Sequence, residues 1–214
     1  GGLQRVTSVI GRELSKKNEV FFYALNNTDN FYEIDNNFID GQPLLFKNIL
    51  LRKIWKSRRI PEQILKRGEY TPYKYIKPTL DKLVQFSSKN QLDYLIVSGP
   101  NITANIPYLR KKLLPSTKII AWQHSNADVY INNYAKRYQS AYLDGLSKAD
   151  HVICLTDSDH DVYVQYNTST TRIYNPLTIE NTECISDLNT KVISFVGRLT
   201  IEAKGIDYLI KIAS

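Results

Sequence analysis

The most informative segment of the sequence is Val192-Ile-Ser-Phe-Val-Gly-Arg-Leu-Thr-Ile-Glu-Ala-Lys-Gly-Ile-Asp-Tyr-Leu-Ile210. Its first five residues are mostly apolar and β-branched, which is typical of a parallel strand buried on both faces. Gly197 would end this strand, and Gly205 would open a helix with an apolar inner face. The stretch therefore predicts a strand, a short loop and a helix, the repeating unit of an α/β fold.

Two cations, Arg198 and Lys204, lie in the predicted loop. Open α/β sheets bind ligands beyond the carboxyl ends of their strands, and a helix N-terminus favours an anion there. An arginine adds a forked pair of hydrogen-bond donors. We therefore expect Arg198 and Lys204 to bind a pyrophosphate, with Gly197 and Gly205 beside it. An ordinary unit of this kind with two solvated cations would show the same spacing.

The run from Phe195 to Leu199 followed by Lys204-Gly205 resembles the second-domain signature of group 1 (family 4-like) retaining glycosyltransferases. Three other motif-like segments resemble this family in the same order along the chain. They are Gly1-Gly2-x-x-Arg5, Trp122-Gln-His124 and Asn175-Pro176. Most of the remaining resemblance is a matter of pattern, but it covers nearly the whole chain.

The resemblance implies the GT-B architecture, in which two Rossmann-like domains face each other. Residues 1–177 would be the N-terminal, acceptor-side domain, 178–190 the linker, and 191–214 the start of the nucleotide-sugar-binding domain. Gly-Gly-x-x-Arg follows the first strand in the family, so a strand is expected before Gly1. The absence of methionine also leads us to expect a piece of a longer protein.

The family also implies roles for individual residues. Arg198 and Lys204 would hold the diphosphate of the sugar donor, and His124 would lie near the transferred sugar and the acceptor. The residues expected on the cleft or acceptor side are Gly1, Gly2, Arg5 and Asn175.

The implied reaction transfers a hexose, with retention, from a nucleotide diphosphate sugar to a hydroxyl of a glycan or lipid-linked acceptor. A UDP-sugar is the expected donor, in cell-surface polysaccharide synthesis, with no cofactor. No metal is expected, because fixed cations can neutralise the leaving diphosphate. The family's paired glutamates in the later part of the second domain, which have seven residues between them, are not present here, so this piece alone is expected to be inactive.

Composition restricts the partners and the compartment. The net charge of +7 favours anionic partners. No apolar run approaches the roughly 20 residues of a membrane-spanning helix, and no signal peptide is visible. Cys154 and Cys184 have neither metal-ligand nor disulfide-scaffold spacing, which favours a cytoplasmic protein, peripheral to the inner face of the plasma membrane if it binds lipid.

A basic amphipathic helix is predicted within residues 44–67, where aliphatic residues and Trp55 alternate with lysines and arginines. Such a helix is typical of elements that bind an anionic membrane surface. It could equally pack its apolar side on the domain and leave its cations in water. Nucleic acid is not an expected partner, because no nucleic-acid motif accompanies the charge.

The apolar periodicity predicts the other elements. Helices are expected over 3–14, 73–89 and 130–146, and Asp157-Ser-Asp159 is expected to cap a further helix. Strands are expected over 20–25, 92–97, 117–124 and 149–156. Asn26 to Asn37 predicts turns, with a possible edge strand over 31–34.

Other classes of protein remain open on the sequence. A non-catalytic GT-B subunit or a nucleotide-sugar epimerase would share the fold, and a basic membrane-surface module would need only residues 44–67. A nicotinamide-binding Rossmann protein should show Gly-x-Gly-x-x-Gly after its first strand, which the glycines fit poorly.

Overall fold

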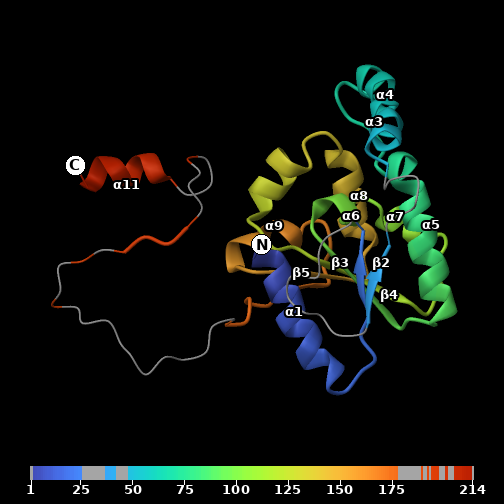
Figure 1. Ribbon diagram of the computed structural model, residues 1–214, viewed down its shortest axis with the longest axis horizontal. Coiled ribbons are helices and arrows are strands. Elements are labelled where there is room, and N and C mark those ends of the chain that lie inside the picture. Colours follow the sequence, from blue (N-terminus) through green and yellow to red (C-terminus); the bar gives the residue numbers. More distant parts are fainter. Residues whose placement is uncertain are drawn as a thin grey trace. The chain divides into compact units, whose positions relative to one another are not determined.

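The computed structural model describes residues 2–25, 37–41, 48–177, 189, 192, 194–197, 201 and 205–213. The chain divides into two compact units, 1–178 and 179–214. Figure 1 shows the elements of both. The predicted edge strand over 31–34 lies outside the described residues. No described helix is long and apolar enough to cross a membrane.

Unit 1 contains two parallel sheets. The larger has the order β3-β4-β5-β6, and the smaller pairs β1 with β2. The strands are β1 (Phe22–Ala24), β2 (Phe38–Asp40), β3 (Tyr94–Ser98), β4 (Lys118–Trp122), β5 (His151–Cys154) and β6 (Thr170–Arg172). The α/β class with parallel strands is confirmed, and it is compatible with a Rossmann-like fold. Because the strands are parallel, their carboxyl ends share one edge of the sheet.

Helices connect and cover the strands. In unit 1 they are α1 (Gly2–Ser15), α3 (Ile49–Ser57), α4 (Arg59–Leu65), α5 (Tyr73–Lys89), α6 (Pro100–Thr103), α7 (Ile106–Arg110), the π-helix η1 (Val129–Tyr134), α8 (Gln139–Lys148) and α9 (Asp157–Tyr163). Figure 1 shows α3 and α4 together beyond one end of α5. The smaller sheet packs on α5, where the Phe86 ring contacts the rings of Phe21 and Tyr23.

The main core lies on one face of the larger sheet. Leu95 pairs with Ile119 and Val97 with Ala121, so these four buried side chains share a face. Residues of α5 to α9 complete this core, among them Leu83, Ile106, Leu109, Leu146 and Tyr163. The alternate residues of β3 point the other way, and Tyr94 and Ile96 are exposed. The sheet is therefore buried much more deeply on one face than on the other.

Helix α8 packs unusually closely on α6. A Cβ built on Gly145 would lie 2.0 Å from the backbone oxygen of Thr103. Only glycine fits at such a separation without moving the backbone. Gly145 therefore lets the two helices approach at the carboxyl side of the sheet.

Several predicted helices are confirmed. The helix predicted over 73–89 is α5, with the same bounds, and that over 3–14 lies within α1. Thr156 is the N-cap of α9, accepting a hydrogen bond from the backbone N–H of Asp159, while Asp157 lies in the first turn. The predicted helix is confirmed, but the predicted cap is wrong, because Thr156 caps the helix and Asp157 and Asp159 lie in its first turn.

Two predicted helices are interrupted. The prediction over 44–67 becomes α3 and α4, because Pro61 has no N–H for the carbonyl of Ser57 and its ring would clash there. The prediction over 130–146 becomes η1 and α8. Between them Tyr138 has φ −154° and ψ 35°, which no helix accommodates, while its ring is buried in the core. Tertiary packing outweighs helical periodicity at this point.

Unit 2 contains α11 (Ile206–Ala213), which begins after Gly205 as predicted. The strand predicted over 192–196 is wrong for the described residues, since Val192 and residues 194–196 form no strand and Val196 is 97% exposed. A parallel strand depends on a neighbour for its hydrogen bonds, and the described residues of unit 2 supply none. Local sequence preference alone did not produce a strand.

Candidate functional site

The candidate site lies where β3 and β4 end at the carboxyl edge of the larger sheet. Ser98 pairs with Trp122, and the backbone N–H of Gly99 donates to the carbonyl of Trp122 over 3.1 Å. Gly99 has φ +84°, a left-handed conformation that favours glycine, and it turns the chain from β3 into α6. The side chains of Ser98 and Trp122 therefore project from neighbouring strand ends.

His124 lies against both of these residues. Its Nε2 is 3.3 Å from the hydroxyl oxygen of Ser98. Its ring stacks on the indole of Trp122, with ring centroids 5.0 Å apart and planes 21° from parallel. His124, two positions beyond β4, is thus held by one contact with the neighbouring strand β3 and one with β4 itself.

Two ring nitrogens in this cluster are buried without a hydrogen-bond partner among the described residues. They are Nδ1 of His124 and Nε1 of Trp122. Trp122 as a whole is only 7% exposed. Buried polar atoms are nearly always hydrogen-bonded, and leaving one unpaired is costly. The two nitrogens therefore have an unmet need for a hydrogen-bond partner, which a ligand or water could meet once the atoms that cover them move.

Burial lowers the pKa of His124 to about 4, from an ordinary value of 6.5. The imidazole is consequently neutral near pH 7, with one nitrogen able to donate and the other able to accept. Burial also raises the pKa of Tyr130, with a hydrogen bond from the His124 backbone opposing the shift. The Tyr130 hydroxyl also lies near Gly99, since a Cβ built there would be 3.9 Å from it.

A buried chain of polar groups holds the segment that carries His124. The amide of Gln123 donates to Thr103 Oγ1 over 3.2 Å and accepts from the Tyr142 hydroxyl over 2.9 Å. Thr103 in turn donates to the carbonyl of Gly99, and Tyr142 lies 3.2 Å from the Tyr163 hydroxyl. These contacts tie β4 to α6, α8 and α9, so they fix the direction in which the chain leaves β4.

Asp159 fixes the loop after His124 from the other side. This buried carboxylate accepts from the backbone N–H of Ala127 over 2.8 Å and from the hydroxyl of Thr156 over 2.6 Å. The loop between β4 and η1 is thus attached to the start of α9. Asp159 has a structural function here beyond that of a helix-cap residue.

Other predicted residues of unit 1 lie on exposed positions. Gly2 begins α1, and a Cβ built there would meet no atom of the described chain within 4 Å. Arg5 is exposed on the same helix, and Asn175 is exposed after β6.

In unit 2 the predicted diphosphate site is described only in part. Gly205 has φ +60°, which favours glycine, and its carbonyl accepts the N–H groups of Tyr208 and Leu209 at the start of α11. A Cβ built on Gly197 would lie 2.9 Å from the Phe195 ring. Arg198 and Lys204, like Gly1 in unit 1, lie outside the described residues.

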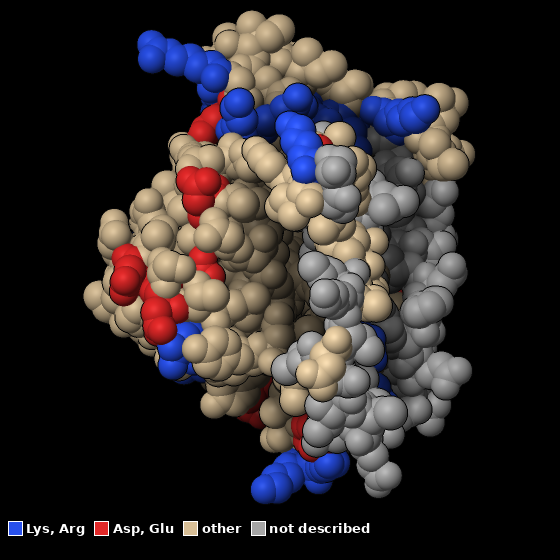
Figure 2. All heavy atoms as spheres, turned by 90° about the vertical axis from the view of Figure 1, so that its left-hand side faces the viewer, with Lys and Arg blue, Asp and Glu red and all other residues tan. Residues whose placement is uncertain are grey.

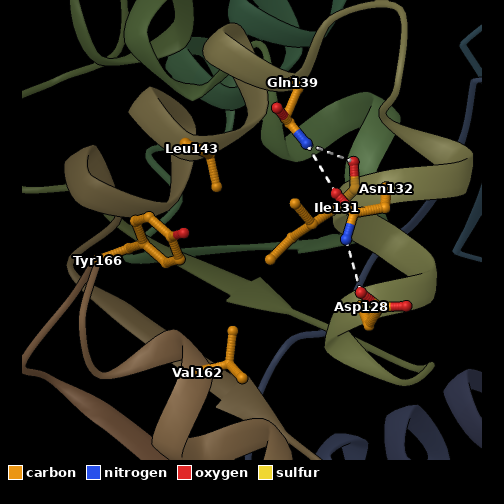
Figure 3. A pocket seen from close by; sticks show the side chains of 7 residues that line it. All are labelled: Asp128, Ile131, Asn132, Gln139, Leu143, Val162 and Tyr166. Atoms are coloured by element: carbon orange, nitrogen blue, oxygen red, sulfur yellow. Dashed lines mark hydrogen bonds between the residues drawn. The ribbon is translucent and has the colours of Figure 1, made fainter.

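A separate pocket of about 350 Å³ lies among η1, α8 and α9. Figure 3 shows the Asn132 side chain between those of Asp128 and Gln139. Asn132 donates to Asp128 over 2.6 Å and accepts from Gln139 over 3.0 Å, so these groups bind each other. Ile131, Leu143, Val162 and Tyr166 form the rest of its lining. We favour the strand-end cluster over this pocket, because only the cluster has unpaired buried nitrogens in the described part of the chain.

Sequence reasoning identified His124 but not all of its surroundings. Ser98, Tyr130 and Gln123 were assigned no role from the sequence. The pairing of Ser98 with His124 follows from two adjacent parallel strands ending together, which their order in the sequence suggests. The buried amide of Gln123 gave no signal in the sequence.

Comparison with known proteins adds no family. No family model, no curated protein and no solved structure matches this chain. The fold and the site together define an α/β protein with parallel sheets, in which a neutral histidine lies in a cluster of side chains at the carboxyl ends of β3 and β4.

Proposed function

We propose that the protein is a glycosyltransferase that moves a hexose from a nucleotide diphosphate sugar to a hydroxyl acceptor with retention. The observation that carries this proposal is the pair of unpaired ring nitrogens, His124 Nδ1 and Trp122 Nε1, at the carboxyl edge of a parallel sheet. Ligands of α/β sheets bind at this edge. Sugar hydroxyls both donate and accept hydrogen bonds, which suits a neutral imidazole beside an indole N–H.

In this proposal His124 orients the transferred sugar or the acceptor hydroxyl. A neutral imidazole can hydrogen-bond to either without placing a positive charge beside the sugar. Ser98, on Nε2, holds the ring so that Nδ1 is left for the ligand. We assign His124 no role as a general base.

The donor's diphosphate is assigned to Arg198 and Lys204, from their positions in the sequence before α11. Breaking the bond between sugar and phosphate develops negative charge on the leaving diphosphate, which two fixed cations and the N–H groups of a helix start would stabilise. A UDP-sugar is the proposed donor, and no metal or other cofactor is part of the proposal. A glycan or lipid-linked hydroxyl is the proposed acceptor, at a cytoplasmic site.

Calorimetric titration of the full-length protein with UDP, GDP and ADP tests the donor half of this proposal. We expect micromolar binding of one nucleotide, lost in the double variant Arg198→Ala, Lys204→Ala. The double variant Lys111→Ala, Lys112→Ala removes the same charge from exposed positions after α7 and should bind normally. A well-folded protein that binds none of the three nucleotides would contradict the proposal.

A further inference from the structure

The helices α3 and α4 carry their aliphatic side chains on the outside. The exposed members are Ile49, Leu50, Leu51, Ile54, Ile60, Ile64 and Leu65. The exposure reaches 66% at Leu50, 76% at Ile64 and 85% at Leu65. Helices of water-soluble domains normally turn such residues to the core, and contiguous exposed apolar surface commonly marks an interaction site.

The inward side of these helices is held by polar contacts instead. The indole N–H of Trp55 donates to the carbonyl of Tyr75 in α5 over 2.9 Å. Arg58 lies over the Trp55 ring at 4.9 Å, and Arg59 lies over the Tyr70 ring at 5.5 Å. The Trp55 indole and the Arg59 guanidinium thus attach the helices to the rest of unit 1, whereas the contact of Arg58 with Trp55 lies within α3 and its cap. The aliphatic side chains remain outside.

Glu62 attaches α4 to the start of α5 and to the loop before it. Its carboxylate accepts from Thr71, Lys74 and Tyr75, and it forms an ion pair with Lys66 over 3.0 Å. Burial alone would raise the pKa of Glu62, but these hydrogen bonds outweigh it and hold the pKa well below its usual range. Glu62 is thereby engaged toward α5.

The charge of this region is strongly one-sided. Residues 48–67 contain seven cations, and Glu62 is their single carboxylate. The cations are Arg52, Lys53, Lys56, Arg58, Arg59, Lys66 and Arg67. Figure 2 shows Lys and Arg side chains gathered at the end of unit 1 where α3 and α4 lie. Exposed aliphatic side chains next to cations match the two layers of an anionic membrane, its acyl chains and its headgroups.

We infer that α3 and α4 form a docking surface for an anionic lipid bilayer. The aliphatic side chains enter the boundary between headgroups and acyl chains, and the exposed cations Lys53 and Lys56 contact the anionic headgroups. The short helices lie on the membrane and do not cross it. This inference does not depend on the proposed transfer reaction, because no donor or acceptor takes part in it.

The surface also has a defined place in the fold. Tyr70, just after α4, donates its backbone N–H to the carbonyl of Arg137, and Ser140 at the start of α8 donates to Glu69. The start of α8 follows the carboxyl end of β4, so the docking surface lies on the same side of the sheet as His124. A membrane bound there would face the ligand-binding edge of the sheet.

Vesicle flotation of the full-length protein tests this inference. We expect binding to phosphatidylcholine vesicles that contain 30% phosphatidylglycerol, weak or no binding to pure phosphatidylcholine, and weaker binding as salt rises. The variant Lys53→Gln, Lys56→Gln should bind the anionic vesicles about 30-fold more weakly, at about fivefold for each cation removed. The variant Ile64→Ser, Leu65→Ser should lose about tenfold or more.

The matched control is Lys89→Gln, Lys111→Gln, which removes the same charge at the far end of α5 and after α7. It should bind as the parent protein does. All changed residues are exposed, and far-ultraviolet circular dichroism would check that each variant folds.

Three results would overturn the inference. The first is equal or absent binding to both kinds of vesicle, and the second is loss of binding in the control but not in the α3–α4 variants. The third is evidence for another partner: either the Ile64→Ser, Leu65→Ser variant converts a dimer into a monomer, or a nucleic acid that binds the same cations displaces the vesicles. Either observation would assign the surface to that partner.

Discussion

The imidazole Nε2 of His124 lies 3.3 Å from the Ser98 hydroxyl, and this contact joins the ends of β4 and β3. No continuous motif contains both residues, since 25 residues separate them in the chain. The parallel register, in which Ser98 pairs with Trp122, brings them together. The other nitrogen of the ring, Nδ1, is left for a ligand in the proposed reaction.

Replacing His124 with alanine should slow sugar transfer while leaving nucleotide binding unchanged. A positioned hydrogen-bonding group typically contributes about 10²-fold in rate. Transfer rate and nucleotide affinity should therefore be measured together on the full-length protein. His160→Ala, on the surface of α9, is the matched control and should transfer at the parent rate. An unchanged rate in His124→Ala would remove this residue from the site.

The pKa of His124 predicts how stability changes with pH. Its value of about 4 in the folded protein lies below 6.5 in the unfolded chain, so the unfolded chain binds the proton first as pH falls. The free energy of unfolding should therefore decrease as pH is lowered from about 6.5 to about 4, and above this window the residue has no effect. Urea unfolding at a series of pH values, beside His124→Gln, measures this. A parent and variant with the same slope would contradict it.

Replacing Gln123 with leucine should destabilise unit 1. The change leaves Thr103 and the Tyr142 hydroxyl without their buried partner, a loss of about 1–3 kcal/mol in the free energy of unfolding. Urea unfolding measures the effect. Gln165→Leu, at an exposed position just after α9, makes the same chemical change and should have little effect. Equal stabilities would show that the buried chain of polar groups is not needed.

Glu62→Gln should loosen the attachment of α4 to α5 and weaken the dependence of stability on acid. The carboxylate's pKa is depressed in the folded protein, so its contribution is present above the unfolded value of 4.5 and is lost as pH falls below it. Unfolding free energies at pH 7 and pH 3 should therefore converge in the variant. Glu13→Gln, at an exposed ion pair with Lys16, is the control and should leave that difference unchanged.

The sequence predicted regular elements well where one kind of preference acted alone. The apolar period gave α5 with its observed bounds, even across Pro78. It failed where two preferences compete, as at Pro61, where the missing N–H divides one predicted helix, and at Tyr138, where core packing bends another. At Val192 the preference for a strand had no neighbouring strand in the described residues to pair with.

The candidate site was predictable in part. The histidine after β4 could be identified because chemistry at strand ends follows from the α/β pattern. The buried nitrogens, the amide of Gln123 and the attachment by Asp159 could not, because they depend on contacts between side chains far apart in the chain. The outward orientation of the aliphatic side chains of α3 and α4 could not be predicted either, because amphipathic periodicity does not show which side of a helix faces solvent.

The position of β3 at the edge of the larger sheet has a consequence for the lifetime of the site. His124 follows β4, which is hydrogen-bonded on both sides, whereas Ser98 ends β3, which within this sheet is bonded on one side only. Brief opening of β3 would release Ser98 and leave His124 with Trp122 on an intact strand. Backbone amides of β3 should accordingly exchange with deuterium faster than those of β4, as NMR would detect, and equal rates would contradict this. The His124 ring would then alternate between a state bound to Ser98 and a state free of it, while β4, which supports the ring, stays folded.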